Sequence, residues 1–355
     1  MGLVRFLFGV LAVLGQGVMP VAAETVRLAM FNVALDRDGP GLLLRDLKRG
    51  DDQARAAALT IAAAAPDILV LARFDYDLHG VALAEFARLV VAQGGPDYPH
   101  HFALRPNAGW ATGLDLDGDG RLGGPGDAQG YGTFAGQGGL ALLSRYPIDQ
   151  GSLRDFSDLL WCDLPGATLP MLEDQPFYDA TARAVLRLSS VGHWVLRIKG
   201  PDAPLWVGAF HATTPVFDGP EDRNGLRNRD EIRFWSLFLD GAFGPPPNRF
   251  VLLGDANLDP QGGEGHHQTI RDLLIHPGLQ DPGQRTINGD RATGLWEDRP
   301  GPLRVDYALP SADLQVTGSG LTGTGDGTGL GATLAEAGLD PPLHRLVWVD
   351  VDTGP

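Results

Sequence analysis

The sequence predicts an α/β fold in which mixed β-sheets are covered by helices. Its apolar runs are short and rich in valine, leucine and phenylalanine, and each ends at a polar or glycine-bearing turn, as in strands buried in a sheet. Amphipathic stretches with leucines and alanines at three- and four-residue spacings lie between several of these runs. Because strands and helices alternate irregularly, a sandwich of mixed sheets is favoured over a doubly wound parallel sheet.

The elements follow from these two patterns. Strands are predicted at residues 26–33, 67–74, 139–145, 183–189, 194–198, 205–212, 250–255, 305–309 and 345–351. Helices are predicted over residues 41–64, 81–91, 227–239 and 268–274, and loops over the glycine-rich stretches 112–138 and 317–331. The letters GSGLTG in the second loop match a dinucleotide-binding fingerprint, but they open no strand-helix-strand unit, so we interpret the match as accidental.

The first 23 residues have the features of a secretory signal peptide. Arg5 precedes the apolar run 6–14, and small residues up to Ala23 offer a cleavage site. The run is short and followed by glycines, which argues against a transmembrane segment, although an uncleaved anchor is the alternative. We therefore expect a secreted or periplasmic protein. No serine-rich or charge-rich linker divides residues 24–355, so we expect them to form a single domain, with 112–138 as a loop insertion.

The net charge limits which partners the protein can bind, and the cysteine content limits how the fold can be stabilised. The net charge of -16 repels nucleic acids and acidic membranes, so tight nonspecific nucleic-acid binding is not expected. The single cysteine, Cys162, excludes an internal disulfide. The fold must then be held by its hydrophobic core and by any bound ions, and we expect a monomer.

Polar residues end several of the predicted strands, where a rigid backbone would hold them over a shared crevice. These candidates are Asn32, Arg73, His211, Asp255, Asn257, Asp306 and His344. Carboxylates can hold a divalent ion or orient a water, amides donate to phosphate oxygens, and a histidine paired with an aspartate moves protons near neutral pH. Each residue alone is a weak signal, but the set suits phosphoester hydrolysis.

The order of the motifs resembles the endonuclease/exonuclease/phosphatase superfamily over essentially the whole mature chain. The motifs are F-N-V, P-D-I-L-V-L, L-S-R-Y-P-I, G-D-x-N, V-D-Y-x-L-P-S and H-R-L-V-W-V-D. The secreted bacterial branch, whose second strand runs into E-F-D-Y-D, is the most similar. This resemblance implies a DNase I-like four-layer sandwich, with two mixed β-sheets packed face to face and flanked by helices. It also implies phosphodiester or phosphomonoester hydrolysis that depends on Mg or Mn.

The resemblance also implies a role for each residue that matches a family motif. Asn32 would help to bind metal and phosphate. Asp255 and Asn257 would position the attacking water and the phosphate, and His211 would act on the side of the leaving group.

Two positions depart from the family. Asp306 would orient His344, which closes the family's Ser-Asp-His motif, but Leu343 stands where this motif has its aspartate. Arg73 stands where the family has a metal-binding glutamate. A guanidinium puts a fixed positive charge where a hard cation needs oxygen ligands, so the usual metal site should not form. With both acids absent the local charge would be about plus one, and Arg73 would bind a phosphate ester, from a small molecule or a lipid head group.

Two alternatives stay open at this stage. Activity would survive if displaced acids, Asp75 and Asp77 or Asp36 and Asp38, supply the missing metal ligands. A secreted interaction module that uses only the loops of the same fold is the other alternative.

The loop 112–138 begins like a calcium loop. Asp115, Asp117 and Asp119 stand at alternate positions and a glycine follows, which matches D-x-D-x-D-G. The twelfth position is a glycine rather than a glutamate, so Asp127 is the candidate substitute, and no helix pair is predicted around the loop. Because extracellular calcium fills weak sites, we expect a structural calcium here, with a hydrated loop as the alternative.

Overall fold

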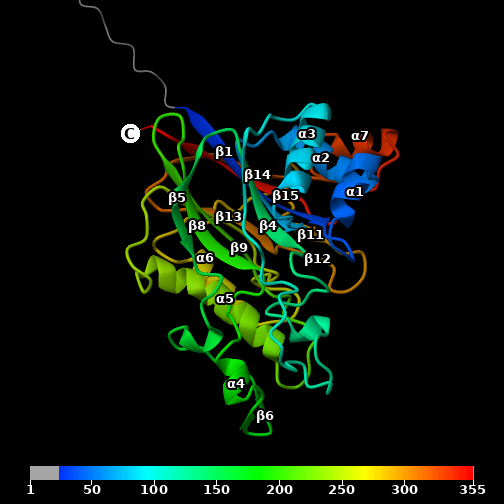
Figure 1. Cartoon of the computed structure of the whole chain (residues 1–355). Helices are drawn as coiled ribbons and strands as arrows, with labels where there is room; N and C mark the ends of the chain where they lie inside the picture. The colour runs from blue at the N-terminus through cyan, green and yellow to red at the C-terminus, as the bar shows by residue number, and fades with distance from the viewer. Residues whose placement is uncertain (1–23, 355) are drawn as a thin grey trace, which may run out of the picture.

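Two mixed β-sheets pack face to face in the computed structural model, which describes residues 24–354 (Figure 1). The predicted signal peptide, residues 1–23, lies outside the described residues. In the described part of the chain, no helix has the length and apolar character needed to cross a membrane. The first sheet has the order β14 (Val316–Thr322), β15 (Leu346–Asp352), β1 (Thr25–Leu35), β2 (Ile68–Phe74), β4 (Gly139–Ser144) and β3 (His100–Ala103).

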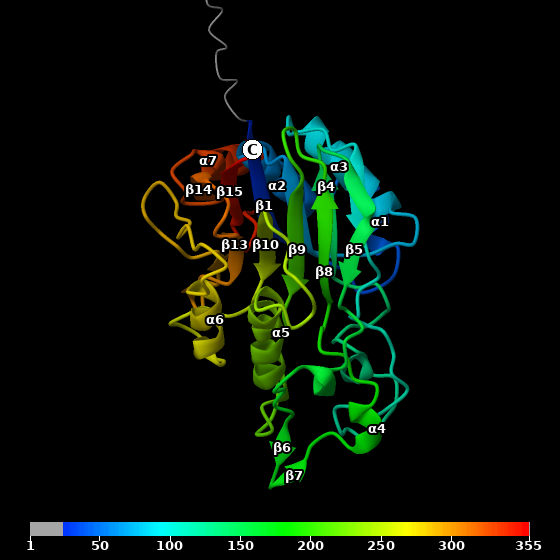
Figure 2. The ribbon, with the colours of Figure 1, turned by 90° about the vertical axis from the view of Figure 1, so that its left-hand side faces the viewer.

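The second sheet faces the viewer in Figure 2. Its order is β13 (Asp306–Pro310), β10 (Phe250–Asp255), β9 (Leu205–His211), β8 (Gly192–Ile198) and β5 (Ile148–Asp155). The pairs β1–β2 and β9–β10 are parallel, and their other neighbours in the two sheets are antiparallel. Both sheets are therefore mixed, as the irregular alternation of elements predicted.

Helices cover the outer face of each sheet. The first sheet is covered by α1 (Leu42–Arg49), α2 (Asp52–Ala64), α3 (Val81–Ala92) and, beside α2, the short α7 (Leu330–Glu336). The second is covered by α5 (Arg223–Leu239) and α6 (His267–Leu274). The remaining short elements are α4 (Ala180–Arg183), the hairpin β6 (Met171–Leu172) with β7 (Gln175–Pro176), and the hairpin β11 (Gly294–Leu295) with β12 (Pro302–Leu303). The architecture is thus a four-layer sandwich.

Alternating side chains divide each strand between two cores. Met30 and Val70 of the first sheet meet Val207 and Leu253 of the second in one buried cluster. Leu69, next to Val70 in β2, instead points into the cluster beneath α1, α2 and α3. Both faces of these strands are buried, which explains why their sequences are continuously apolar rather than alternating.

Local backbone signals account for one difference from the predicted elements. The helix predicted over residues 41–64 is two helices, because Gly50 takes a left-handed conformation with φ 79° after α1. Asp51 then caps α2 by accepting a hydrogen bond from the backbone amide of Ala54.

Two other predictions were wrong. Residues 183–189 do not form a strand. Asp179 caps the short helix α4, which ends at Arg183, and the chain then continues as turns with an isolated bridge from Leu160 to Arg187. Residues 317–331 are not a loop throughout, since most of β14 and the start of α7 fall within them. The strands β3 and β5 were not predicted, because their sequences, HHFA and IDQGSLRD, are short or polar.

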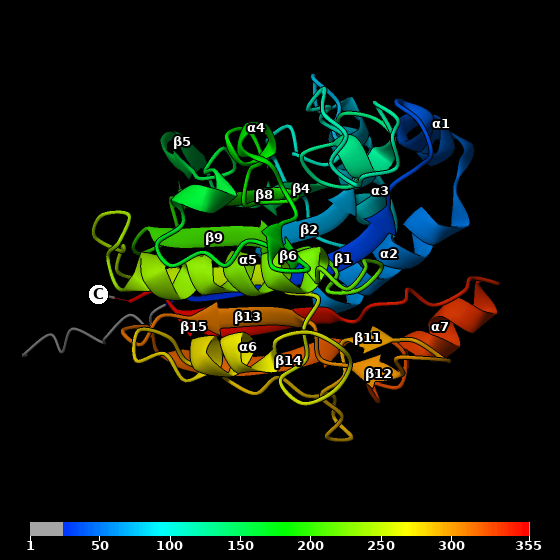
Figure 3. The same cartoon turned by 90° about the horizontal axis from the view of Figure 1, so that it is seen from below.

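The ends of the central strands meet at one edge of the sandwich. Asn32 near the end of β1 donates a hydrogen bond to Asp255, the last residue of β10, and so joins the two sheets. Figure 3 shows the loops at this end, with the hairpin β11–β12 on one side and the insertion between β3 and β4 on the other. The polar residues that end the strands are therefore brought together.

Candidate functional site

A hydrogen bond across the two sheets forms the base of the site. The side-chain amide of Asn32 donates from Nδ2 to Oδ2 of Asp255 over 2.8 Å. Oδ1 of Asn32 accepts from the backbone amide of Ala34 over 3.1 Å, which fixes the orientation of the amide. Both side chains are buried, so this contact is shielded from water.

The turn after β10 holds Asn257 close to Asp255. Oδ1 of Asp255 accepts from the backbone amide of Asn257 over 2.9 Å, and Asn257 has a left-handed conformation with φ 48°, which asparagine tolerates. Nδ2 of Asn257 donates to the carbonyl of Ala212 over 2.9 Å. This amide therefore ties the turn after β10 to the end of β9.

A buried pair of His344 and Asp306 lies beside this turn. Nδ1 of His344 is 2.8 Å from Oδ2 of Asp306, and both residues are buried. The backbone amide of Asp306 donates to Oγ1 of Thr293 over 3.0 Å, and the ring of Trp296 meets the imidazole edge-on with centroids 5.5 Å apart. Oδ1 of Asp306 is buried and has no hydrogen-bond partner among the described residues.

His211, the last residue of β9, lies on the other side of Asp255. Its Nε2 is 3.6 Å from Oδ2 of Asp255, too far for an ordinary hydrogen bond. Its buried Nδ1 has no partner among residues 24–354. The imidazole therefore keeps its hydrogen-bonding capacity, which suits a group that exchanges a proton with a ligand.

The two histidines are driven toward different charge states. Burial lowers the pKa of His211, and the nearby Asp255 only partly opposes this. Burial also acts to lower the pKa of His344, but the charge and hydrogen bond of Asp306 outweigh it, and the pKa of His344 is raised. Burial, followed by the like charge of Asp306, raises the pKa of Asp255.

Arg73, near the end of β2, is paired with Asp36. Its Nη2 lies 2.8 Å from Oδ1 and 3.0 Å from Oδ2 of Asp36, while 41% of its side chain stays exposed. Arg73 directly follows Ala72, which pairs with Asn32 in the first sheet, so it lies at the same edge of the sandwich. The predicted local charge of about plus one is therefore wrong, because Asp36 neutralises the guanidinium.

The backbone at Arg73 is strained. Its φ of 53° is in the left-handed region, which non-glycine residues rarely adopt, and the register of β1 with β2 shifts at this point. Such strain is concentrated at ligand-binding and catalytic sites. The conformation turns the side chain out of the regular alternation of β2 and toward the turn that follows β1.

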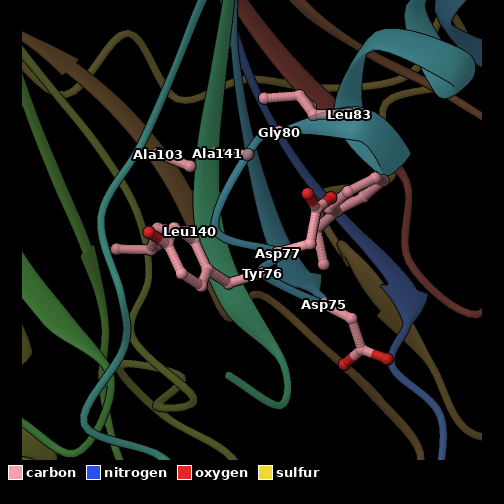
Figure 4. A pocket seen from close by; sticks show the side chains of 9 residues that line it. Asp75, Tyr76, Asp77, Gly80, Leu83, Ala103, Leu140 and Ala141 are labelled. Atoms are coloured by element: carbon pink, nitrogen blue, oxygen red, sulfur yellow. The ribbon is translucent and has the colours of Figure 1, made fainter. Parts of the chain in front are cut away.

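The acids next to Arg73 are engaged in hydrogen bonds and ion pairs of their own. Oδ2 of Asp75 accepts from the backbone amide of Arg37 over 2.9 Å, and Oδ1 accepts from that of Gly138 over 3.0 Å. Asp77 accepts three backbone hydrogen bonds at the start of α3. Figure 4 shows both side chains beside a cavity of about 10 Å³, which is large enough only for one water. Asp36 is paired with Arg73, and Asp38 is exposed.

The donor set does not fit the hard divalent ion that the family implies. Asp255, Asp306 and His344 offer ligand atoms within 4.8 Å of one another. However, His344 and Asp306 are hydrogen-bonded to each other, and both oxygens of Asp255 already accept hydrogen bonds. Among the oxygens of these two aspartates, only Oδ1 of Asp306 is without a partner. Mg²⁺ needs six ligands in near-octahedral geometry, and Arg73 adds a positive charge nearby.

The insertion brings together three of the four aspartates expected to bind calcium. Asp115, Asp117 and Asp127 offer oxygens within 4.8 Å of one another, but Asp119 is not part of this group. Asp119 is exposed and instead accepts from the backbone amide of Arg121 over 2.8 Å. Buried Asp127 accepts from two backbone amides, so it also organises the loop itself. The insertion lies between β3 and β4, and its last residue, Gly138, reaches the strand-end site, where it donates to Asp75.

Some site residues were not predicted in their observed roles. Asp36 was expected only as a displaced metal ligand, although its position directly after β1 is the same kind of signal that identified Asn32. Thr293 and Trp296 lie in an irregular segment around a two-residue strand, where no periodic pattern marks them. Their contacts with Asp306 and His344 become visible only in the folded chain.

The fold and this set of strand-end residues define a DNase I-like protein. The family model described as "Endonuclease/Exonuclease/phosphatase family" matches residues 31–328, so the chain belongs to this family of phosphoester hydrolases. His344 lies outside the matched span, and it is the structure that places it against Asp306. No curated protein matches the chain by sequence.

Solved structures of the same fold cover nearly the whole chain. An endonuclease/exonuclease/phosphatase from Beutenbergia cavernae is 18% identical with a TM-score of 0.54, over 93% of this chain and 72% of that one. A family protein from Bacteroides thetaiotaomicron is 12% identical with a TM-score of 0.52, over 92% and 95%. Sphingomyelinase C from Streptomyces griseocarneus is 14% identical with a TM-score of 0.49, over 93% and 100%. At these identities the similarity to the first two structures shows the fold alone.

The buried carboxyl of Asp75 should make stability depend on pH. Burial outweighs its hydrogen bonds and raises its pKa from 3.8 to about 6, so the folded chain binds this proton more tightly than the unfolded chain. The contribution of Asp75 to the free energy of unfolding should be greatest below pH 3.8 and should decrease as the pH rises to about 6. Urea denaturation of the wild type and of Asp75→Asn should show a difference that changes over this window. Asp38→Asn controls for the loss of one charge, and a difference that does not vary with pH would contradict the prediction.

The expected calcium in the insertion can be tested by thermal unfolding. Millimolar calcium should raise the melting temperature of the wild type by roughly 2–4 °C, because a ligand that binds only the folded state stabilises it. Asp117→Ala should remove this increase, since it deletes one of the three converging carboxylates. Asp119→Ala should keep it, because this side chain lies outside the group. An unchanged wild-type melting temperature would show that the loop is only hydrated.

Proposed function

We propose that this protein binds phosphate esters at the strand-end site, with Arg73 in the place of the family's divalent ion, and that it hydrolyses them inefficiently. The observation that carries the proposal is the position of the Arg73 guanidinium, which is half exposed and stands on the residue after Ala72, the strand partner of Asn32. A guanidinium binds phosphate oxygens through paired N–H donors, so it can recognise the group that a metal ion would otherwise hold.

A ligand phosphate would have to compete with Asp36 for Arg73. The carboxylate of Asp36 accepts a hydrogen bond from this guanidinium, and its side chain is less exposed than that of Arg73. The raised pKa of His344 favours its charged form beside Asp306, and the lowered pKa of His211 favours its neutral form. Because carboxylates surround the site, we expect weak affinity for simple phosphate esters and stronger affinity once Asp36 is neutralised.

The absence of a fitting metal site explains why we expect slow hydrolysis. In metal-dependent phosphoester hydrolysis, the ion stabilises the charge that develops on the phosphoryl oxygens and the leaving group. Arg73 can stabilise part of this charge but cannot generate a metal-bound hydroxide. The predicted signal peptide supports a periplasmic or extracellular location, and the ligand would be a small phosphate ester or a lipid head group.

A second candidate function is metal-dependent hydrolysis by a rearranged site. The proximity of Asp255, Asp306 and His344, with Oδ1 of Asp306 unpartnered among residues 24–354, favours this alternative. It requires the ligand to displace the existing hydrogen bonds. The third alternative, an interaction module without a site, is less favoured because the strand-end residues converge on one buried cluster.

Substitution of Arg73 tests phosphate-ester binding directly. Calorimetry with phenyl phosphate should show binding to the wild type, and Arg73→Ala should weaken it by about ten- to a hundredfold, the usual value of a hydrogen bond between charged groups. Asp36→Asn should strengthen binding, because it removes the competing carboxylate. Arg271→Ala, which removes an exposed guanidinium from α6, is the matched control. Wild-type binding that Arg73→Ala leaves unchanged would refute the assigned role.

Chelation distinguishes this proposal from the metal-dependent alternative. Turnover of bis(p-nitrophenyl) phosphate by the purified wild type should stay low and should not increase when magnesium or manganese is added. Removal of metal with EDTA should leave any residual rate unchanged, because no step depends on an ion. Turnover that the chelator abolishes and manganese restores would favour the rearranged metal site, and Asp306→Asn would then reduce it.

A further inference from the structure

Two arginines pack against one indole ring near the same end of the sandwich. Cζ of Arg105 lies 4.1 Å from the ring centroid of Trp110, and Cζ of Arg187 lies 4.5 Å from it. Trp110 is half-buried, Arg105 is exposed and Arg187 is half-buried. Attraction between the cations and the aromatic ring holds both guanidinium groups in place although they repel each other.

Neither of these arginines is neutralised by an acid. Among residues 24–354, no carboxylate forms a salt bridge with Arg105 or Arg187, whereas Arg27, Arg145 and many other arginines have one. The one side-chain acceptor of Arg187 is the neutral amide of Asn107, whose Oδ1 lies 2.7 Å from Nη1. In a chain with a net charge of -16, two unneutralised guanidinium groups on one ring form a local positive region.

A third arginine fixes the segment that carries Arg187. Within residues 24–354, the buried guanidinium of Arg227 in α5 donates only to backbone carbonyl oxygens, among them those of Leu188 at 2.8 Å and Arg187 at 2.7 Å. These hydrogen bonds hold the backbone of residues 187–189 in place.

This region lies at the strand-end site rather than on a remote surface. Arg105 follows β3 by two residues, and the backbone amide of Asn107 donates to the carbonyl of Val191, directly before β8. The next residue, Gly192, pairs with His211 in the second sheet. In the first sheet β4 separates β3 from β2, so the end of the β3 backbone, two residues before Arg105, lies two strands, or roughly 10 Å, from the β2 backbone that carries Arg73.

We propose that Arg105 and Arg187 form a second anion-binding subsite, which takes a further phosphate group of a ligand whose first phosphate lies at Arg73. The inference rests on the proposed function, because the second phosphate adds affinity to the first. Guanidinium groups match phosphate geometry, and a shared indole keeps them from folding back onto nearby acids. The ligand class is therefore a small molecule with two phosphate groups far enough apart to reach both subsites at once.

Calorimetry with straight-chain diol bisphosphates of increasing length tests the subsite. Alkyl monophosphates of the same chain length are the matched probes, because each carries one phosphate and cannot bridge the two subsites. Once the chain is long enough to reach the second subsite, the bisphosphate should bind the wild type about tenfold or more tightly than its monophosphate. The advantage should be absent for chains that are too short.

Substitutions assign this advantage to the two arginines. Arg105→Gln and the double variant with Arg187→Gln should remove the preference for the long bisphosphate and leave monophosphate affinity unchanged. Arg105 makes no side-chain hydrogen bond within residues 24–354, so its substitution should not disturb folding, which the melting temperature checks. Arg285→Gln, at another exposed arginine, should keep the preference.

The outcomes separate the subsite from the proposed function. If the wild type binds monophosphate and bisphosphate equally at every length, or if the double variant keeps the preference, the second subsite is refuted while the role of Arg73 stands. If the wild type binds no monophosphate and no bisphosphate, both proposals fail. A length-dependent preference that Arg105→Gln alone reduces supports the subsite.

Discussion

The hydrogen bond between Asn32 and Asp255 is the contact on which the arrangement of the site depends. It crosses from the first sheet to the second at the point where their cores end, so it fixes how the edges of the sandwich meet. Asp255 is fully buried and also accepts from the turn that holds Asn257, and it lies beside His211. Without a donor from the opposite sheet this carboxylate would be buried with too few partners, which is costly.

Much of the fold could be predicted from the sequence because the sandwich core is built from continuous apolar strands. Strands such as β1, β2 and β10 are buried on both faces, and their hydrophobic runs are unambiguous. Edge strands gave weaker signals, since β5 has exposed and polar residues and is held mainly by pairing with β8. The stretch 183–189 was misassigned because its apolar residues pack beneath irregular turns rather than in a sheet.

The sequence predicted which residues lie at the site, but not which hydrogen bonds and ion pairs they form with one another. Strand-end position was enough to group His211 and Asp255, which end parallel strands, with His344, which precedes a strand that runs antiparallel to β1 and so starts at the same edge. Which partner each side chain takes is decided by tertiary contacts. The sequence identified Arg73 as a positive charge, but only the folded chain shows that Asp36 lies within hydrogen-bonding distance of it. The roles implied by the family resemblance remain predictions for these residues.

The left-handed backbone at Arg73 places stability and binding in conflict at one residue. Glycine and asparagine adopt a φ of 53° readily, whereas an arginine in this conformation raises the free energy of the folded chain. Selection for a more stable chain would therefore replace this side chain early, and the charge that distinguishes the site would disappear without any damage to the sandwich. The guanidinium is thus held at the site at a cost in conformational free energy that a glycine would avoid.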